Sequence, residues 1–331
     1  MPLDDRWPHA SVGVAATCRS GPSFVAVGMV NRHSDQVANV VAVLPADGHV
    51  HSQFSWDAPH GDMHATCARA MALGLPALAF TEHLDLTPWT LRAHPVPPGC
   101  RGRADARGRY LGEALDVAAH LERLLRCQQA FPGLVIWSGL EISEPHWHPR
   151  EVAEVVAAVS PQRVIASVHA LADVHLGAAD GGYVEVGDGF DQRPAVEVVR
   201  AYLAEVTAMC TSRAPFDVLG HIDYPLRYWP KGAGPVPWEE LADDFRAALE
   251  AAAAAERVLE VNTRVPLPPR VLSWWHQAGG QAVVFGSDAH RPLELGRGLV
   301  EAAAMVSAHG FVPGQRPFEP WRRGPGRGGA R

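Results

Sequence analysis

Residues 47–57, Asp-Gly-His-Val-His-Ser-Gln-Phe-Ser-Trp-Asp, combine a strand-like alternation with three candidate metal ligands. They follow the apolar run 40–44, so we predict a buried strand that runs into a loop. Because side chains alternate along a strand, His49 and His51 point to the same side and can hold one metal ion through ring nitrogens. Asp57 can add an oxygen ligand from the loop. An HxH pair also occurs in ordinary loops, so this stretch alone leaves both interpretations open.

The composition is that of a soluble globular protein. Apolar residues make up 47% of the 331 residues and charged residues 20%, which is enough apolar material for one large α/β domain or two smaller ones. The net charge of −7 argues against nucleic-acid binding as a main role.

The cysteines and the hydropathy pattern indicate a cytoplasmic protein. The five cysteines are scattered and form no CxxC pair, so a disulfide scaffold and a thiolate zinc site are both unexpected. No apolar run reaches 18 residues, and residues 1–30 lack the pattern of a signal peptide, so we predict no membrane span.

Short β-prone runs alternate with helical patterns from about residue 40 onward, which predicts parallel βα units. The strands are expected at 40–44, 77–81, 134–142, 163–168, 216–222, 258–263 and 282–287. The helices are expected at 61–74, 108–130, 148–158, 194–211, 238–256, 267–278 and 294–308. The helix at 108–130 is predicted from an apolar stripe at i+3 and i+4 spacing, made of Leu111, Leu115, Ala118, Leu121 and Leu125.

Seven βα units with nearly continuous apolar strands favour a closed barrel over an open sheet, because barrel strands are buried on both sides. We expect this barrel domain at 39–312, after an N-terminal extension at 1–38 and before a disordered Arg/Gly/Pro-rich tail at 313–331. The long loops 88–107 and 172–193 are candidates to cover one end of the barrel.

Residue types that bind metals recur where the predicted strands end. Parallel strands bring their carboxyl ends to one rim, so these side chains are expected to converge there with the ligands of the first stretch. The additional candidates are His83, Glu141, His169, His221, Asp288 and His290. Nine ligands are too many for one ion and suit two or three, which Glu141 can bridge with its two oxygens. Mixed imidazole and carboxylate ligands suit Zn²⁺, Mn²⁺ or Fe²⁺, and paired metals predict an activated hydroxide as the nucleophile.

The order of these motifs resembles the PHP (polymerase and histidinol phosphatase) family, in particular its histidinol-phosphatase branch. The resemblance covers about residues 46–300 and rests on HxH, an Asp eight residues after the first His, TEH, GLE, SVH, GHID and SDAH. It implies a distorted (β/α)7 barrel with a two- or three-metal site at the C-terminal rim of the strands. It also implies phosphomonoester hydrolysis, with Asp288, His290 and Glu141 as the expected catalytic residues.

The segment after SVH, Ala-Leu-Ala-Asp-Val-His-Leu-Gly at 170–177, departs from the aromatic Asp-Gly-Trp type that is usual in histidinol-phosphate enzymes. The resemblance therefore leaves the substrate alcohol open. Phosphate oxygens need arginine donors, for which we predict Arg264, Arg291 and Arg227. Asp85 and Asp223 either orient neighbouring histidines or cap turns.

The main hypothesis is a metal-dependent phosphatase that acts on a small phosphorylated substrate, with no nucleic-acid or membrane partner. Two alternatives remain: an amidohydrolase-type enzyme that cleaves C–N or C–O bonds on the same rim, and a non-catalytic metal-binding module. The oligomeric state is not predicted.

Overall fold

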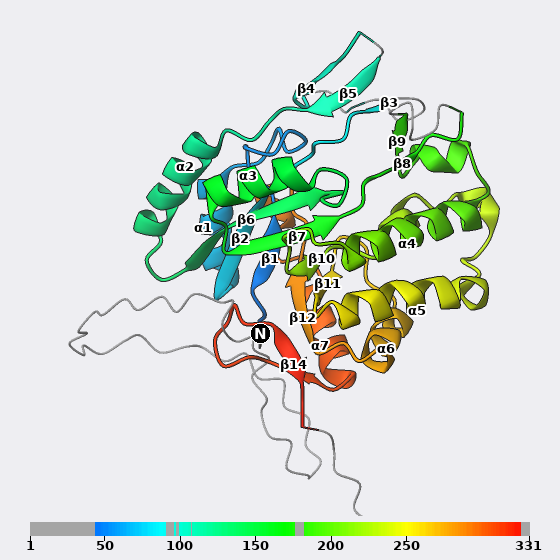
Figure 1. Cartoon of the computed structure of the whole chain (residues 1–331). Coiled ribbons are helices and arrows are strands. Elements are labelled where there is room, and N and C mark those ends of the chain that lie inside the picture. Colours follow the sequence, from blue (N-terminus) through cyan, green and yellow to red (C-terminus); the bar gives the residue numbers. More distant parts are fainter. Residues whose placement is uncertain (1–43, 91–95, 97–98, 107, 176–181, 326–331) are drawn as a thin grey trace, which may run out of the picture. The chain divides into compact units, whose positions relative to one another are not determined.

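The structure is a computed structural model that describes residues 44–90, 96, 99–106, 108–175 and 182–325 (Figure 1). Its strands are β1 (Asp47–Val50), β2 (Ala77–Leu84), β3 (Trp89–Thr90), β4 (Gly102–Ala104), β5 (Arg109–Gly112), β6 (Val135–Ser143), β7 (Arg163–Ser167), β8 (Ala170–Ala172), β9 (Tyr183–Glu185), β10 (Val218–Leu219), β11 (Val258–Asn262), β12 (Ala282–Gly286), β13 (Phe311–Val312) and β14 (Trp321–Arg323). Its α-helices are α1 (Met63–Leu73), α2 (Val117–Ala130), α3 (Pro149–Val159), α4 (Ala195–Thr211), α5 (Trp238–Ala254), α6 (Pro269–Gln277) and α7 (Leu299–Ala308). The 3-10 helices among the described residues are η3 (Asp188–Asp191), η4 (Tyr224–Tyr228), η5 (Lys231–Ala233) and η6 (Pro292–Glu294).

The main sheet has nine strands in the order β1-β2-β6-β7-β10-β11-β12-β14-β13. Neighbours from β1 to β12 are parallel, and β14 pairs antiparallel with β12 and β13. The sheet curls until the first and last parallel strands meet, because Val50 bridges to Ala289 and the amide of His51 donates to the carbonyl of Ala289 at 2.8 Å. This large curled parallel sheet agrees with the predicted α/β class.

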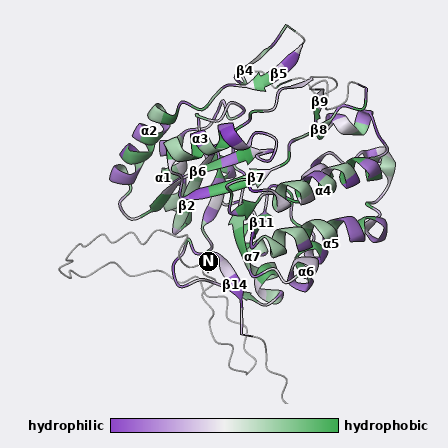
Figure 2. Ribbon diagram, in the orientation of Figure 1, coloured by the Kyte–Doolittle hydropathy of each residue, from purple (hydrophilic) through white to green (hydrophobic). Residues whose placement is uncertain are grey.

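The helices cover the sheet and close the core around it. The strands β7 and β11 are largely hydrophobic (Figure 2), as expected for strands that are buried on both faces. The core includes the large buried side chains of Tyr202 on α4, Phe245 on α5 and Trp275 on α6. Asp62 is the N-cap of helix α1, and its side chain accepts a hydrogen bond from the amide of Ala65 at 2.9 Å.

Most of the predicted strands and helices overlap those of the structure, but the first strand does not. The apolar run 40–44 was expected as a strand, whereas the first strand is Asp47–Val50 and contains His49 itself. Leu44 lies outside any strand, and residues 40–43 lie outside the described part of the chain.

The prediction of a helix at 108–130 was wrong for its first third. Residues Arg109–Gly112 form strand β5 instead. It pairs with β3 and β4, which lie in the segment 88–107 that was expected to be a loop, in a three-stranded sheet. The helix begins only after Asp116, whose side chain accepts from the amide of Ala119. The predicted apolar stripe is not the buried side either, because Leu125 is 54% exposed while Leu124 is buried.

Part of the segment expected to be a disordered tail is an ordered element of the sheet. Trp321–Arg323 forms β14, in which Arg322 pairs with Ala282 of β12, and the Trp321 side chain is buried. Residues 326–331 lie outside the described ranges. None of the helices in those ranges has the length and apolar character needed to cross a membrane.

Candidate metal centre

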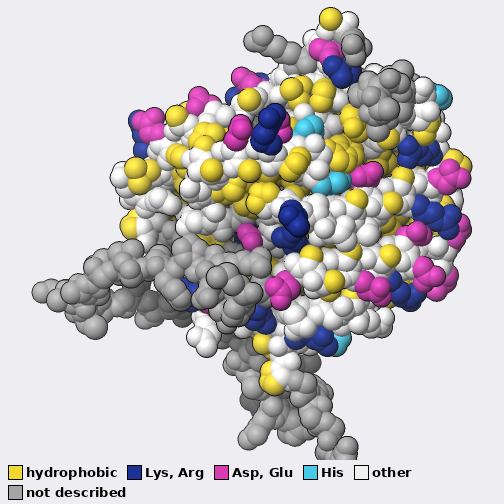
Figure 3. Space-filling view, in the orientation of Figure 1, with side chains coloured by type: hydrophobic (Ala, Val, Ile, Leu, Met, Phe, Trp, Pro, Cys, Tyr) yellow, Lys and Arg dark blue, Asp and Glu magenta, His cyan; other side chains and the backbone are white. Residues whose placement is uncertain are grey.

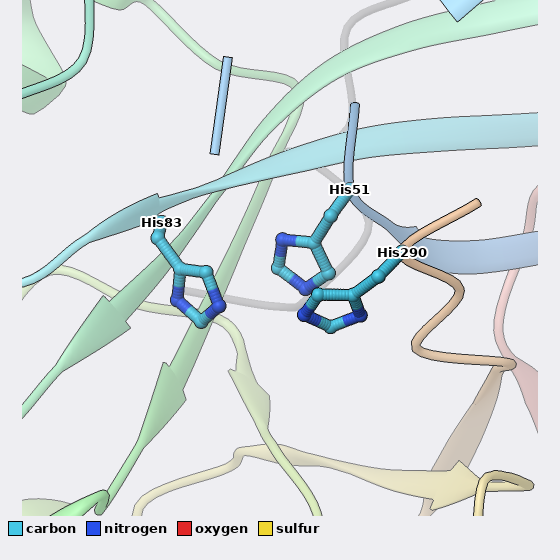
Figure 4. A group of neighbouring side chains, drawn as sticks. All are labelled: His51, His83 and His290. Carbon is cyan, nitrogen blue, oxygen red and sulfur yellow. The ribbon is translucent and has the colours of Figure 1, made fainter. Parts of the chain in front are cut away.

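Histidines and carboxylates line the floor of a pocket of ≈ 960 Å³ at the carboxyl ends of the parallel strands. In four groups of three, the ligand atoms lie within 4.8 Å of one another. The groups are His51, His83 and His290; His49, His51 and Asp288; His83, Asp85 and His169; and Glu141, His169 and His221. Figure 4 shows the first of these groups, in which rings from three different segments of the chain turn toward one common point.

The first pair of predicted ligands lies together as expected from strand alternation. Nε2 of His49 is 3.1 Å from Nε2 of His51, and Oδ1 of Asp288 is 3.9 and 3.5 Å from these two nitrogens. All three side chains are buried.

Hydrogen bonds behind the rings fix which ring nitrogen of each histidine carries the proton. Nδ1 of His49 lies 2.7 Å from the carboxylate of Glu260 and donates to it. The hydroxyl of Ser55 donates to Glu82 at 2.6 Å, so it accepts the proton of His51 Nδ1 at 3.0 Å. When these rings are neutral, as metal binding requires, both Nε2 atoms therefore present lone pairs.

These lone pairs face one another and the carboxylate of Glu141, whose Oε2 is 3.1 Å from His49 Nε2 and 3.3 Å from His51 Nε2. An arrangement of acceptors alone is repulsive unless a positive charge lies among them. Imidazole nitrogens and carboxylate oxygens are also the donor atoms that divalent transition metals prefer. The residues therefore fit a metal ion.

Glu141, at the end of β6, faces two groups of histidines with its two oxygens. While Oε2 points to the first pair, Oε1 lies 2.9 Å from His221 Nε2 and 3.5 Å from His169 Nε2. Ser167 donates to the same Oε1 at 2.7 Å. This two-sided position is the geometry that a carboxylate needs to bridge two ions.

Asp85 lies close to His83 and His169, but both of its oxygens already accept hydrogen bonds. Trp56 Nε1 donates to Oδ2 at 2.5 Å, and the hydroxyl of Ser143 donates to Oδ1. The Ser143 oxygen in turn lies 2.7 Å from His169 Nδ1 and accepts its proton. These contacts favour a role for Asp85 in orienting a histidine.

Asp57 lies beside the group of Figure 4. Its Oδ2 is 2.8 Å from His290 Nε2 and 3.4 Å from His83 Nε2. The structure thus brings together all nine residues predicted as metal ligands.

Asp288 has a left-handed backbone, with φ 54°. Few residues other than glycine adopt this conformation, and it is held here because the amide of Asp288 donates to the carbonyl of His49 at 2.8 Å. The turn aims the carboxylate at His49 and His51.

The buried charges shift one another's protonation. Burial lowers the pKa of His49, but the carboxylates of Glu141 and Glu260 outweigh it and raise this pKa well above its ordinary value. Burial raises the pKa of Asp288, but Arg227 and the nearby histidines outweigh it and hold the pKa well below its ordinary value. Burial dominates at His221 and lowers its pKa to about 4. The carboxylates are therefore ionised and can accept cations.

The three predicted arginines all line the pocket, but they differ in their contacts. Arg227 is nearly buried and reaches Oδ2 of Asp288 at 2.7 Å. Arg264 lies 3.5 Å from Oδ1 of the same carboxylate and donates to its backbone carbonyl. Arg291 is more exposed and pairs with Glu294 at 3.4 Å.

Sequence reasoning missed the residues behind the rings, Glu260, Glu82 and Ser55. Glu260 and Glu82 are fully buried acids inside strands β11 and β2. A charged residue in the middle of an apolar strand is itself the signal, since burying a charge is costly unless it has partners.

A curled parallel sheet whose strands carry histidines and carboxylates at their carboxyl ends is typical of an α/β protein with a metal site. A family model, the PHP domain, matches residues 47–264, and the chain therefore belongs to the PHP domain family.

Similar proteins are known in several bacteria. The histidinol-phosphatase of Lactococcus lactis is 26% identical over 277 residues, which cover 80% of this chain and 91% of that protein. A probable histidinol-phosphatase of Deinococcus radiodurans is 27% identical over 278 residues, covering 78% and 92%. The crystal structure of the L. lactis histidinol phosphate phosphatase, complexed with zinc, L-histidinol and phosphate, matches with a TM-score of 0.65 at 23% identity, covering 84% of this chain and 98% of that one. This structural match shows that the two chains share a fold.

Proposed function

We propose that this protein is a metal-dependent phosphatase that hydrolyses histidinol phosphate or a closely related phosphomonoester. The observation that carries the proposal is the position of Glu141, whose two oxygens face His49 and His51 on one side and His169 and His221 on the other. Membership of the PHP domain family and the names of its full-length relatives support the choice of substrate.

The residues proposed as metal ligands are those predicted from the sequence, and they suit two or three ions of zinc, manganese or iron. They are His49, His51, Asp57, His83, Glu141, His169, His221, Asp288 and His290. Metal ions held there lower the pKa of a water molecule toward about 7 and offset the charge of phosphoryl oxygens. We also propose that the seven parallel strands from β1 to β12, within 39–312, form a distorted (β/α)7 barrel that closes where Val50 meets Ala289.

The chain's own side chains bind the phosphate and move the proton. Arg227 and Arg264 present guanidinium groups beside Asp288, where they can donate to phosphoryl oxygens. The ionised Asp288 can accept a proton from the attacking water at Oδ1 and return it to the leaving alkoxide. The partly exposed Arg291 is placed to contact the outer part of the ester.

The test is a His49→Ala/His51→Ala double variant of the full chain, compared with His64→Ala, which removes an exposed histidine on α1. Elemental analysis should show metal in the wild-type and control proteins and a loss of metal in the double variant. The rate of phosphate release from histidinol phosphate should fall together with the metal content, by at least about a thousandfold, because bound ions lower the activation free energy by several kcal/mol. Full activity of the double variant after chelation would refute the site, and turnover of amides without phosphate release would favour the amidohydrolase alternative.

A further inference from the structure

The outer wall of the pocket is built by two short strands that the proposed chemistry does not use. Strand β9 (Tyr183–Glu185) pairs with β8 and lies next to β3 (Trp89–Thr90). Figure 1 shows β3 and β9 side by side. Trp89 and Glu185 from these strands both line the pocket that contains the metal centre.

The carboxylate of Glu185 is held in a defined position. Oε1 accepts a hydrogen bond from the hydroxyl of Tyr224 at 2.9 Å, and Oε2 accepts from the amide of Gly187 at 2.7 Å. A side chain at Gly187 would not fit, since its Cβ would lie 2.6 Å from Oε2 of Glu185. The carboxylate therefore keeps one orientation toward the pocket.

Among the described residues, no arginine, lysine or histidine lies within ion-pair distance of Glu185. The described arginines of the pocket lie beside other acids: Arg227 and Arg264 face Asp288, while Arg291 and Arg297 face Glu294. A half-buried carboxylate costs free energy unless it is paired, so Glu185 is suited to a cation that arrives with the ligand.

One aromatic ring separates Glu185 from the metal centre. The ring of Tyr224, whose hydroxyl holds Glu185, lies 4.8 Å from the ring of His221 and 4.9 Å from that of His169 between centroids. A molecule with a phosphate at the centre and a positive charge a few bonds away can therefore reach both positions. The pocket thus offers arginines for an anion and, across the Tyr224 ring over which Arg227 lies, a carboxylate for a cation.

We infer that Glu185 binds the ammonium group of the leaving alcohol, so that the substrates are phosphate monoesters of amino alcohols. This inference rests on the proposed phosphatase function. Histidinol phosphate belongs to this class, because it carries an ammonium group on the carbon next to the ester-bearing carbon. Recognition at Glu185 discriminates it from phosphate esters of neutral alcohols, which leave the carboxylate unpaired.

The test uses a pair of esters that differ in one group: histidinol phosphate and its deamino analogue. The wild-type protein should prefer histidinol phosphate by about tenfold to a hundredfold in kcat/KM, as expected for a hydrogen bond between charged groups. Glu185→Gln should reduce this preference to about threefold or less, with kcat/KM for the deamino analogue nearly unchanged and the metal content intact. Glu205→Gln, which removes a carboxylate of α4 that pairs with His146, serves as the control and should keep the preference.

Binding of histidinol, measured by calorimetry, gives a readout without catalysis, and its Kd should rise about tenfold or more in Glu185→Gln. If that variant does not fold, Tyr224→Phe removes one hydrogen bond to the carboxylate and should weaken the preference by a few fold. Equal use of the two esters by the wild type, or an equal loss for both in Glu185→Gln, overturns the inference while phosphatase activity stands. A wild-type protein that releases phosphate from neither ester overturns the proposed function, and this inference with it.

Discussion

Oε1 of Glu260 lies 2.7 Å from Nδ1 of His49, and both side chains are fully buried. The other oxygen of Glu260 accepts from the amide of His221 at 2.8 Å, so one carboxylate connects two of the proposed ligands. A carboxylate behind a histidine fixes the ring orientation and makes the opposite nitrogen a better metal donor.

Replacing Glu260 by Gln should weaken metal binding about tenfold to a hundredfold, because the ring of His49 loses its charged acceptor. Competition with a chromophoric zinc chelator measures this change. Glu250→Gln, on the exposed side of α5, is the matched control. Equal zinc affinity of the Glu260 variant and the control would show that Glu260 is only a structural residue.

Ser55→Ala should act on the neighbouring histidine. The hydroxyl accepts the proton of His51 Nδ1 and also the amide of His83 at 3.1 Å, so its loss frees the His51 ring to adopt the other tautomer. We expect zinc affinity to fall about tenfold and the ¹⁵N shifts of His51 to report a mixture of tautomers. Ser307→Ala, at an exposed position of α7, should change neither measurement, and a single unchanged tautomer in Ser55→Ala would contradict the assignment.

Metal binding should release protons at neutral pH. Burial lowers the pKa values of His49, His83 and His169, but nearby carboxylates, above all Glu141 and Asp57, outweigh it and raise all three pKa values in the metal-free protein. Ligation needs neutral imidazoles, so ions displace these protons and affinity increases with pH. Calorimetry in two buffers of different ionisation enthalpy measures the released protons, and a heat independent of the buffer would contradict the prediction.

The raised pKa values of these histidines also determine how the stability of the metal-free protein changes with pH. Histidines with a raised folded-state pKa stabilise the protein fully below their unfolded value of about 6.5 and lose that contribution as pH rises through the folded value. The unfolding free energy of chelated protein should therefore decline above neutral pH, whereas metal-loaded protein should not show this decline. Urea titrations between pH 6 and 9 on both forms compare the two, and parallel curves would exclude the effect.

Gly286 allows the close packing behind the centre. A methyl group there would overlap with Oε1 of Glu260 and with Cβ of His49. Gly286→Ala should therefore lower the free energy of unfolding by about 1–3 kcal/mol and weaken zinc binding as the pair is pushed apart. Gly232→Ala, where a methyl group meets no neighbour, is the control. An alanine variant with unchanged stability and zinc binding would contradict this packing argument.

The sequence alone was sufficient to predict that the candidate ligands at strand ends lie close together, since parallel strands bring those ends to one rim. It was not sufficient for Glu260 and Glu82, which lie inside strands. Glu82 meets Ser52 and Ser55 once β1 and β2 have paired, and Glu260 meets His49 only when the sheet curls.

The wrong predictions of the first strand and of the helix at 108–130 have similar causes. Leu111 and Leu115 have helical spacing, yet β5 forms because Tyr110 packs against Trp56 and Trp89, with ring centroids 5.5 and 5.4 Å away. The first strand begins at Asp47 because its carboxylate accepts from the amides of Ser287 and Gly296, at 2.8 and 3.0 Å. No local pattern reveals contacts with residues 240 or more positions away.

The bridge between Val50 and Ala289 has a consequence for biosynthesis. Asp288 and His290 are translated more than 230 residues after His49 and His51. With the ligands proposed above, a nascent chain would hold an incomplete set of donors until the last parallel strand has docked. Tight metal binding would then report a finished fold.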